Sequence, residues 1–214
     1  MQNIKIEMIE KLFQYTSSDE IKDKSFKLLI PEKKEIKKYL CAIVISVISS
    51  YLFSVSENTV ELFFDTVDNI NNIVIALFGI VFTGYALFQA FIGKEMLLRM
   101  LSYTEGKGDK EKSNLQKSNE SFAETMMLQF ICIVLNVFLI IIGKCIPENW
   151  TLFENAKANE YLAMIGIGLY FYLMMIAILE IKGFIYNIFQ FFNLHAGSRI
   201  IEILKENNQS EHEK

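Results

Sequence analysis

Histidine, the residue most often used for acid–base catalysis, occurs only twice in this sequence of 214 amino acids. His195 and His212 are the only imidazoles, and both lie in the carboxyl-terminal segment, where a solvated surface histidine is the ordinary case. No GxSxG turn, glycine-rich phosphate loop or HExxH pair occurs. We therefore expect that the protein is not an enzyme.

The three cysteines do not suggest a metal centre or a disulfide framework. Cys41, Cys132 and Cys145 are widely spaced, and none belongs to a CxxC pair. The sequence therefore predicts neither a metal ion nor another cofactor.

Two amides interrupt a long apolar stretch. Gln129 and Asn136 fall on one helical face together with Cys132 and Gly143. Two interpretations are open, because the amides could line a polar path through a pore or could hydrogen-bond to a neighbouring helix. Such bonds contribute about 0.6 to 2 kcal/mol each. The lack of accompanying charged residues favours the helix contact, since ion paths in membranes usually carry acidic or basic side chains.

Glu180 and Lys182 are the only ionisable residues close to an apolar core. Both lie about 20 residues after Glu160, which places them at a membrane interface. Long charged side chains at that depth reach water by snorkelling. We expect a solvated pair here rather than a proton relay.

Small and polar side chains recur in the segment that includes ALFGIVFTGYALFQAFIGKEMLLRM, at alternating steps of four and three residues. These steps match the a and d positions of left-handed helix packing. In lipid, helices associate where small residues allow close approach. The sequence therefore predicts a helix-packing seam, at the centre of the bundle or of an oligomer. The seam comprises Asn72, Ala76, Gly79, Thr83, Ala86 and Ala90.

These residues lie in a chain that is 52% hydrophobic and 21% charged, with the two kinds of residue in separate blocks. A membrane-spanning helix needs about 20 mostly apolar residues. Because the apolar blocks lack a period of two, helices are expected rather than strands. The sequence predicts an all-α integral membrane protein, with four transmembrane helices and cytoplasmic helical extensions. The predicted spans are about 39–56, 69–93, 125–146 and 161–181.

The basic residues predict how the chain is oriented. Of the 21 lysines and arginines, 19 lie before the first span, in the loop 94–124 or in the tail from Lys182. By the positive-inside rule these three segments are cytoplasmic. The predicted parts are a cytoplasmic amphipathic segment (1–38), the transmembrane domain (39–192) and a cytoplasmic tail (193–214).

The predicted cytoplasmic segments are expected to contain further helices. The second span is expected to run on as the rod KEMLLRM, and a capping box, Ser121-Phe-Ala-Glu124, to start the third. The aromatic segment GFIYNIFQFFNL is expected either to extend the fourth helix or to lie in the interface plane. An apolar face after the second span predicts a cytoplasmic docking surface. It comprises Met96, Leu97, Met100 and Leu101.

Two functions are compatible with this layout. Most of the mass outside the membrane is predicted to face the cytosol, which favours a homo-oligomeric sensor or scaffold that recruits or regulates a cytoplasmic protein partner. The alternative is a pore-forming or membrane-depolarising effector, lined by Gln129, Asn136, Thr83 and Asn72. Membrane lipid is a partner in either case. Direct binding of nucleic acid is not expected, because the net charge is −4 and the general attraction of a basic domain is missing.

The hydropathy plan of the whole chain, with the block IVIALFGIVFTGYALFQAFIGKEMLLRMLSY from Ile73 to Tyr103, resembles the KwaA membrane subunits of the Kiwa anti-phage defence system. The resemblance implies a tetrameric sensor of phage infection in the bacterial inner membrane. It also implies a cytoplasmic, DNA-binding partner of the KwaB kind. No diagnostic motif accompanies it, so it assigns no role to an individual residue.

Overall fold

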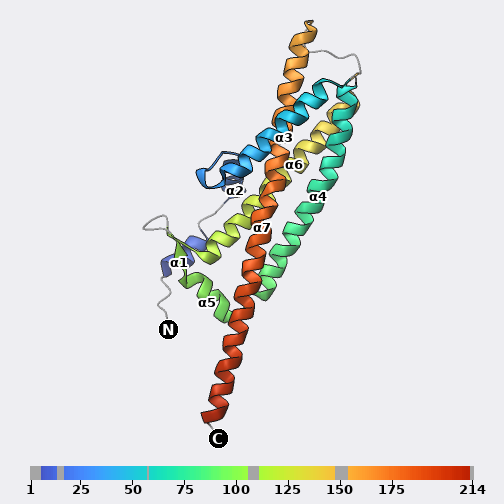
Figure 1. Ribbon diagram of the computed structural model, residues 1–214. Coiled ribbons are helices and arrows are strands. Elements are labelled where there is room, and N and C mark those ends of the chain that lie inside the picture. The colour runs from blue at the N-terminus through green and yellow to red at the C-terminus, as the bar shows by residue number, and fades with distance from the viewer. Residues whose placement is uncertain (1–5, 14–16, 57, 106–110, 148–153, 213–214) are drawn as a thin grey trace.

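Four long helices dominate the computed structural model (Figure 1). The structure describes residues 6–13, 17–56, 58–105, 111–147 and 154–212. All four helices are long and apolar enough to cross a membrane, which confirms the predicted all-α fold with four spans. The helices are α3 (Ile36–Ser54), α4 (Thr59–Phe91), α6 (Asn114–Cys145) and α7 (Ala156–His212).

Three of these helices are longer than the predicted spans by eight residues or more. The 33 residues of α4 rise about 50 Å, against about 30 Å for the hydrocarbon core of a bilayer. The 57 residues of α7 rise about 85 Å, and its carboxyl-terminal part runs on alone beyond the bundle (Figure 1). The aromatic segment 183–194 is therefore part of a continuous helix, the first of its two predicted alternatives.

The four helices pack as two pairs. Helix α3 lies along α7, α4 lies along α6, and α7 also contacts both members of the second pair (Figure 1). Phe64 of α4 lies against Gly143 of α6, and Gln89 lies beside Asn119, so these two helices run antiparallel. One buried cluster joins all four helices, and a second, rich in phenylalanine, lies where α4, α6 and α7 meet the short helix α5 (Lys94–Ser102).

The shorter elements gather at one end of the bundle, which we call the basic end. They are α1 (Ile6–Leu12), α2 (Ser18–Lys27), the 3-10 turn η1 (Lys33–Glu35), α5 (Lys94–Ser102) and the two-stranded antiparallel ladder of β1 (Thr104–Glu105) and β2 (Lys112–Ser113). Residues 1–5 and 14–16 of the predicted amphipathic segment, and 106–110 of the predicted loop, lie outside the described residues.

Two predicted helix boundaries are wrong. Helix α4 ends at Phe91, because Ile92 and Gly93 have extended backbones, and KEMLLRM begins the separate helix α5. Helix α6 begins at Asn114 rather than after Ser121. The hydroxyl of Ser113 accepts a hydrogen bond from the backbone N–H of Gln116 at 3.2 Å, so the capping sequence is Ser113-Asn-Leu-Gln116.

Candidate functional site

The predicted seam lies on the outward face of α4. All six of its residues are exposed, whereas the buried residues of α4 are Val67, Asn71, Val74, Val81, Gly84 and Phe88. Residues 76, 83, 86 and 90 each follow a buried residue by two positions. Two positions turn about 200° around a helix, so the seam faces away from the bundle. The expectation that it forms the centre of the bundle is wrong, while its role in an oligomer stays a prediction.

Glycines show the same division of α4. A Cβ added at Gly79, in the seam, meets nothing within 4 Å. A Cβ added at Gly84, on the inward face, overlaps the ring of Phe184 of α7. Gly84 therefore permits close approach of α4 and α7, which is the function that the sequence assigned to Gly79.

The two predicted intramembrane amides are buried between the helices of the chain. Gln129 is 1% exposed and Asn136 is 0% exposed, and all four of their side-chain polar atoms lack a hydrogen-bond partner among the described residues. The antiparallel register of α4 and α6 places Asn71 at the level of Asn136, and the Oδ1 atom of Asn71 has no described partner. We call Asn71, Gln129 and Asn136 the interior amides. The predicted hydrogen bonds to a neighbouring helix are not formed in the described chain.

Replacing Asn136 by leucine, which has a similar shape, is expected to stabilise the protein. An unpaired buried polar group costs about 1 to 3 kcal/mol, and an apolar group of the same shape removes this cost. The measurement is thermal unfolding of the detergent-solubilised protein, followed by circular dichroism. Gln129→Met should act in the same direction. A loss of stability in both variants would show instead that the amides have partners in the folded protein.

The predicted docking surface is covered by the chain itself. Met96, Met100 and Leu101 are 2%, 5% and 7% exposed, and Leu97 is half-buried against the same cluster. The prediction of a partner surface here is therefore wrong. Its apolar pattern is real, but α5 folds across the basic end after the break at Gly93 and packs on the chain's own phenylalanine cluster.

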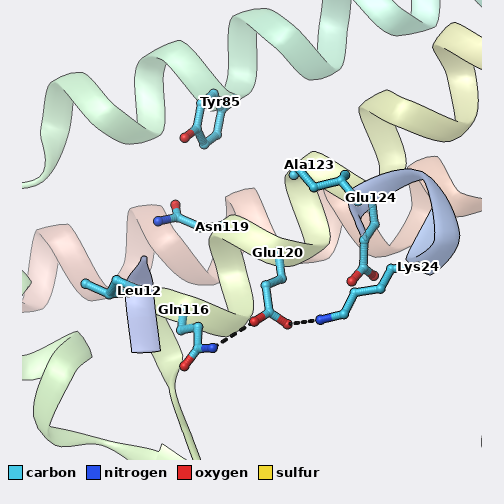
Figure 2. Close-up of a pocket in the computed structure, with 9 residues that line it drawn as sticks. Leu12, Lys24, Tyr85, Gln116, Asn119, Glu120, Ala123 and Glu124 are labelled. Atoms are coloured by element: carbon cyan, nitrogen blue, oxygen red, sulfur yellow. Dashed lines mark hydrogen bonds and ion pairs between the residues drawn. The ribbon is translucent and has the colours of Figure 1, made fainter. Parts of the chain in front are cut away.

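A carboxylate in the first turns of α6 organises the basic end (Figure 2). The Glu120 side chain, 9% exposed, forms ion pairs with Lys112 and with Lys24 of α2, whose Nζ lies 3.5 Å from it. Gln116 donates to the other Glu120 oxygen at 2.9 Å. Burial lowers the pKa of the Lys24 ammonium, and the nearby Glu120 opposes this shift. These contacts hold α2, the strand β2 and α6 together.

A small pocket of about 150 Å³ lies beside Glu120. Leu12, Tyr85, Asn119 and Glu124 also line it, so it joins α1, α4 and α6 (Figure 2). Sequence reasoning missed this arrangement. Lys24 and Glu120 are 96 positions apart, and no local pattern links them; only the capping sequence at Ser113 would have shown that Glu120 is already helical.

Glu180 does not form the predicted solvated pair with Lys182. It accepts a hydrogen bond from Lys38 of α3 at 2.7 Å, and Lys38 also pairs with Glu35. The side chains of Lys38 and Glu180 are only 14% and 13% exposed. Lys182 is exposed. Residues two apart on a helix point in nearly opposite directions. The side chain of Lys182 therefore points away from the bundle, whereas the side chain of Glu180 points into it.

No group of three or more metal-binding side chains comes together among the described residues. No family model matches the chain, and no curated protein or solved structure matches it. The outward seam, the interior amides and the basic end are therefore the features of the chain that bear on its function.

Proposed function

We propose that this protein is a homo-oligomeric scaffold or sensor subunit of a bacterial inner membrane, whose basic end faces the cytosol and recruits or regulates a soluble protein partner. The observation that carries the proposal is the position of the seam. Its six residues are regularly spaced, small or polar, and exposed on α4, where no part of the described chain covers them.

The chemistry of the seam supports helix contact rather than lipid contact. Small residues offer acyl chains little surface, but they allow two helix backbones to approach closely. The Thr83 hydroxyl donates to the Gly79 carbonyl at 2.8 Å, so it has a partner within its own helix. All copies of a membrane protein insert in the same direction, and the seams of two copies therefore lie at the same depth.

The partner-binding part of the proposal is supported by the carboxyl-terminal part of α7. Ile200, 20 residues after Glu180, lies about 30 Å further along the axis of α7. The side chains of Ile200, Ile203 and Leu204 are 58%, 45% and 55% exposed. Apolar side chains at that distance from the membrane are suited to contact with a protein. The resemblance to KwaA subunits supports a role in anti-phage defence, a tetramer and a KwaB-like partner.

A pore-forming effector is the second candidate, and the outward position of the polar residues Asn72 and Thr83 on α4 favours it. The four residues first assigned to the lining do not share one surface, however. Gln129 and Asn136 are buried within the helix bundle. Asn72 and Thr83 are exposed on the outer face of α4. A pore on the axis of an oligomer would therefore be lined by α4 and not by α6.

The oligomer is tested by replacing Gly79 and Thr83 together with leucine. We expect the detergent-solubilised double variant to shift to the mass of a monomer, because bulky side chains separate the helices. The measurement is light scattering after size-exclusion chromatography. Phe82→Leu is the matched control, since Phe82 is exposed on α4 outside the seam.

An unchanged mass of the double variant would overturn the seam as an interface. The partner is tested by co-purification of the wild-type chain with the product of the neighbouring gene. A wild-type protein that is monomeric and brings down no such product would contradict the scaffold. Loss of membrane potential on expression, prevented by the double variant, would favour the pore.

A further inference from the structure

A large cleft opens at the boundary between the bundle and the basic end. Its volume is about 930 Å³, at the upper end of the range for ligand sites. One wall is the end of α2 with the start of α3, the second is the start of α6, and the third is the middle of α7. Glu180, which ends the predicted fourth span, lines it, so the cleft lies at the depth of lipid headgroups.

Four lysines line the cleft. Lys24 and Lys27 come from the last turn of α2, and Lys112 and Lys117 flank the start of α6. The first turns of α6 contribute Asn114 and Ser118, and the amino-terminal end of a helix favours an anion. One side of the cleft thus combines positive side chains with a positive helix end.

Four glutamates also line the cleft, and two of them have a partner. Glu35 and Glu180 share the ammonium of Lys38. Glu32 is exposed at the rim, and Glu124 lies near Lys24. Glu120, outside the lining, forms ion pairs with Lys24 and Lys112. Because Lys24 and Lys112 hold Glu120, substituting either of them would disturb the packing of the basic end as well as the cleft.

The floor of the cleft is apolar. It is formed by Phe88, Phe122 and Phe191, which are 1%, 2% and 5% exposed. On α7 the lining residue Tyr186, 61% exposed, is followed by Phe189, 59% exposed. The apolar lining therefore continues onto the outer surface of α7.

We propose that this cleft binds a phospholipid of the leaflet that surrounds the basic end, with its phosphate against the lysines of α2 and α6 and its acyl chains along α7. Basic pockets between transmembrane helices are suited to anionic headgroups. A soluble phosphate compound would use the lysines but would leave the aromatic floor and the exposed face of α7 without a role. The site does not depend on the seam of α4, and it joins a membrane-spanning helix to the elements of the basic end.

The first test uses the full chain, delipidated in detergent and titrated with dioleoyl phosphatidylglycerol in native mass spectrometry. Lys27→Gln with Lys117→Gln is expected to weaken binding about fivefold for each lysine removed. The matched control is Lys33→Gln with Lys34→Gln, because these lysines are exposed in η1 and do not line the cleft. Equal weakening by both pairs would overturn the site, since it would indicate a general attraction to basic residues.

A second variant tests whether the lipid lies in the cleft, and it does so without changing the charge of the protein. Gly183 lines the cleft, and a Cβ added there meets nothing within 4 Å, so the side chain of Gly183→Trp can leave the backbone without a clash and should occupy part of the cleft. Gly197→Trp is the control on the same helix, because a Cβ added there also meets nothing within 4 Å and Gly197 does not line the cleft. We expect only Gly183→Trp to abolish lipid binding. Retained binding overturns the proposal.

A competition experiment tests whether the phosphate bound in the cleft belongs to a lipid or to a soluble compound. Glycerol 3-phosphate, which carries the phosphate without acyl chains, should not displace the lipid at equal concentration. Displacement would overturn the lipid as the occupant and would assign the lysines to a soluble phosphate compound. Dioleoyl phosphatidylcholine should bind more weakly than phosphatidylglycerol, because its headgroup has no net charge; equal binding would contradict a site built on the four lysines.

Discussion

Replacing Lys38 by methionine is expected to lower the free energy of unfolding by about 3 kcal/mol, the lower end of the range for breaking a buried ion pair. The variant would leave the Glu180 carboxylate almost covered and without its cation, the Lys38 ammonium whose Nζ lies 2.7 Å from Glu180 Oε1. Lys38 also lies over the ring of Tyr39, at 4.6 Å from its centre, and bonds Glu35, so one substitution removes three contacts. The measurement is unfolding by added denaturing detergent in mixed micelles.

Two further variants separate the lost pair from a general loss of charge. Lys182→Met removes a cation two residues from Glu180, but Lys182 is exposed, and no change in stability is expected. Lys38→Met combined with Glu180→Leu removes both charges and should regain most of the stability. A Lys182→Met variant as unstable as Lys38→Met would refute the assignment, as would a double variant no more stable than the single one.

The sequence was sufficient to predict the four spans, because length and apolar composition alone decide which helices can cross a membrane. It was not sufficient to predict which face of α4 is inward. In water the polar face of a helix marks the outside, but in lipid both faces are apolar and the contrast is lost. The steps from Val81 to Gly84 and Phe88 repeat the steps from Thr83 to Ala86 and Ala90, so spacing could not separate the two faces.

The errors at the basic end have a different cause. An amphipathic pattern predicts that one face of a helix will be buried, but it does not predict which surface will bury it. Helix α5 satisfies its pattern on the chain's own Phe88 and Phe122, so no docking surface remains there. The Lys38–Glu180 pair joins residues 142 positions apart. Such pairs follow from the packing of α3 on α7, which a linear pattern does not specify.

Replacing Gly84 by leucine is expected to disrupt the packing of α4 on α7. The added Cβ would overlap the Phe184 ring and would come within 3.4 Å of Ile188 Cδ1. Phe184 is 6% exposed and packs edge-on against Phe122, with the two ring centroids 5.6 Å apart, so displacing its ring disturbs the buried phenylalanine cluster. Overpacking of this kind costs about 1 to 3 kcal/mol, and a whole leucine side chain should place the loss at the upper end.

The control is Gly79→Leu, five residues earlier on the opposite face of α4. Each variant is examined for thermal unfolding and for mass in detergent. Gly84→Leu should lower the unfolding temperature because it acts within one chain, whereas Gly79→Leu should leave the unfolding of the monomer unchanged and weaken the assembly. The reverse result, a stable Gly84→Leu protein and an unfolded Gly79→Leu protein, would mean that α4 presents the seam inward. The two glycines thus report separately on the contact that folds the chain and the contact proposed to join its copies.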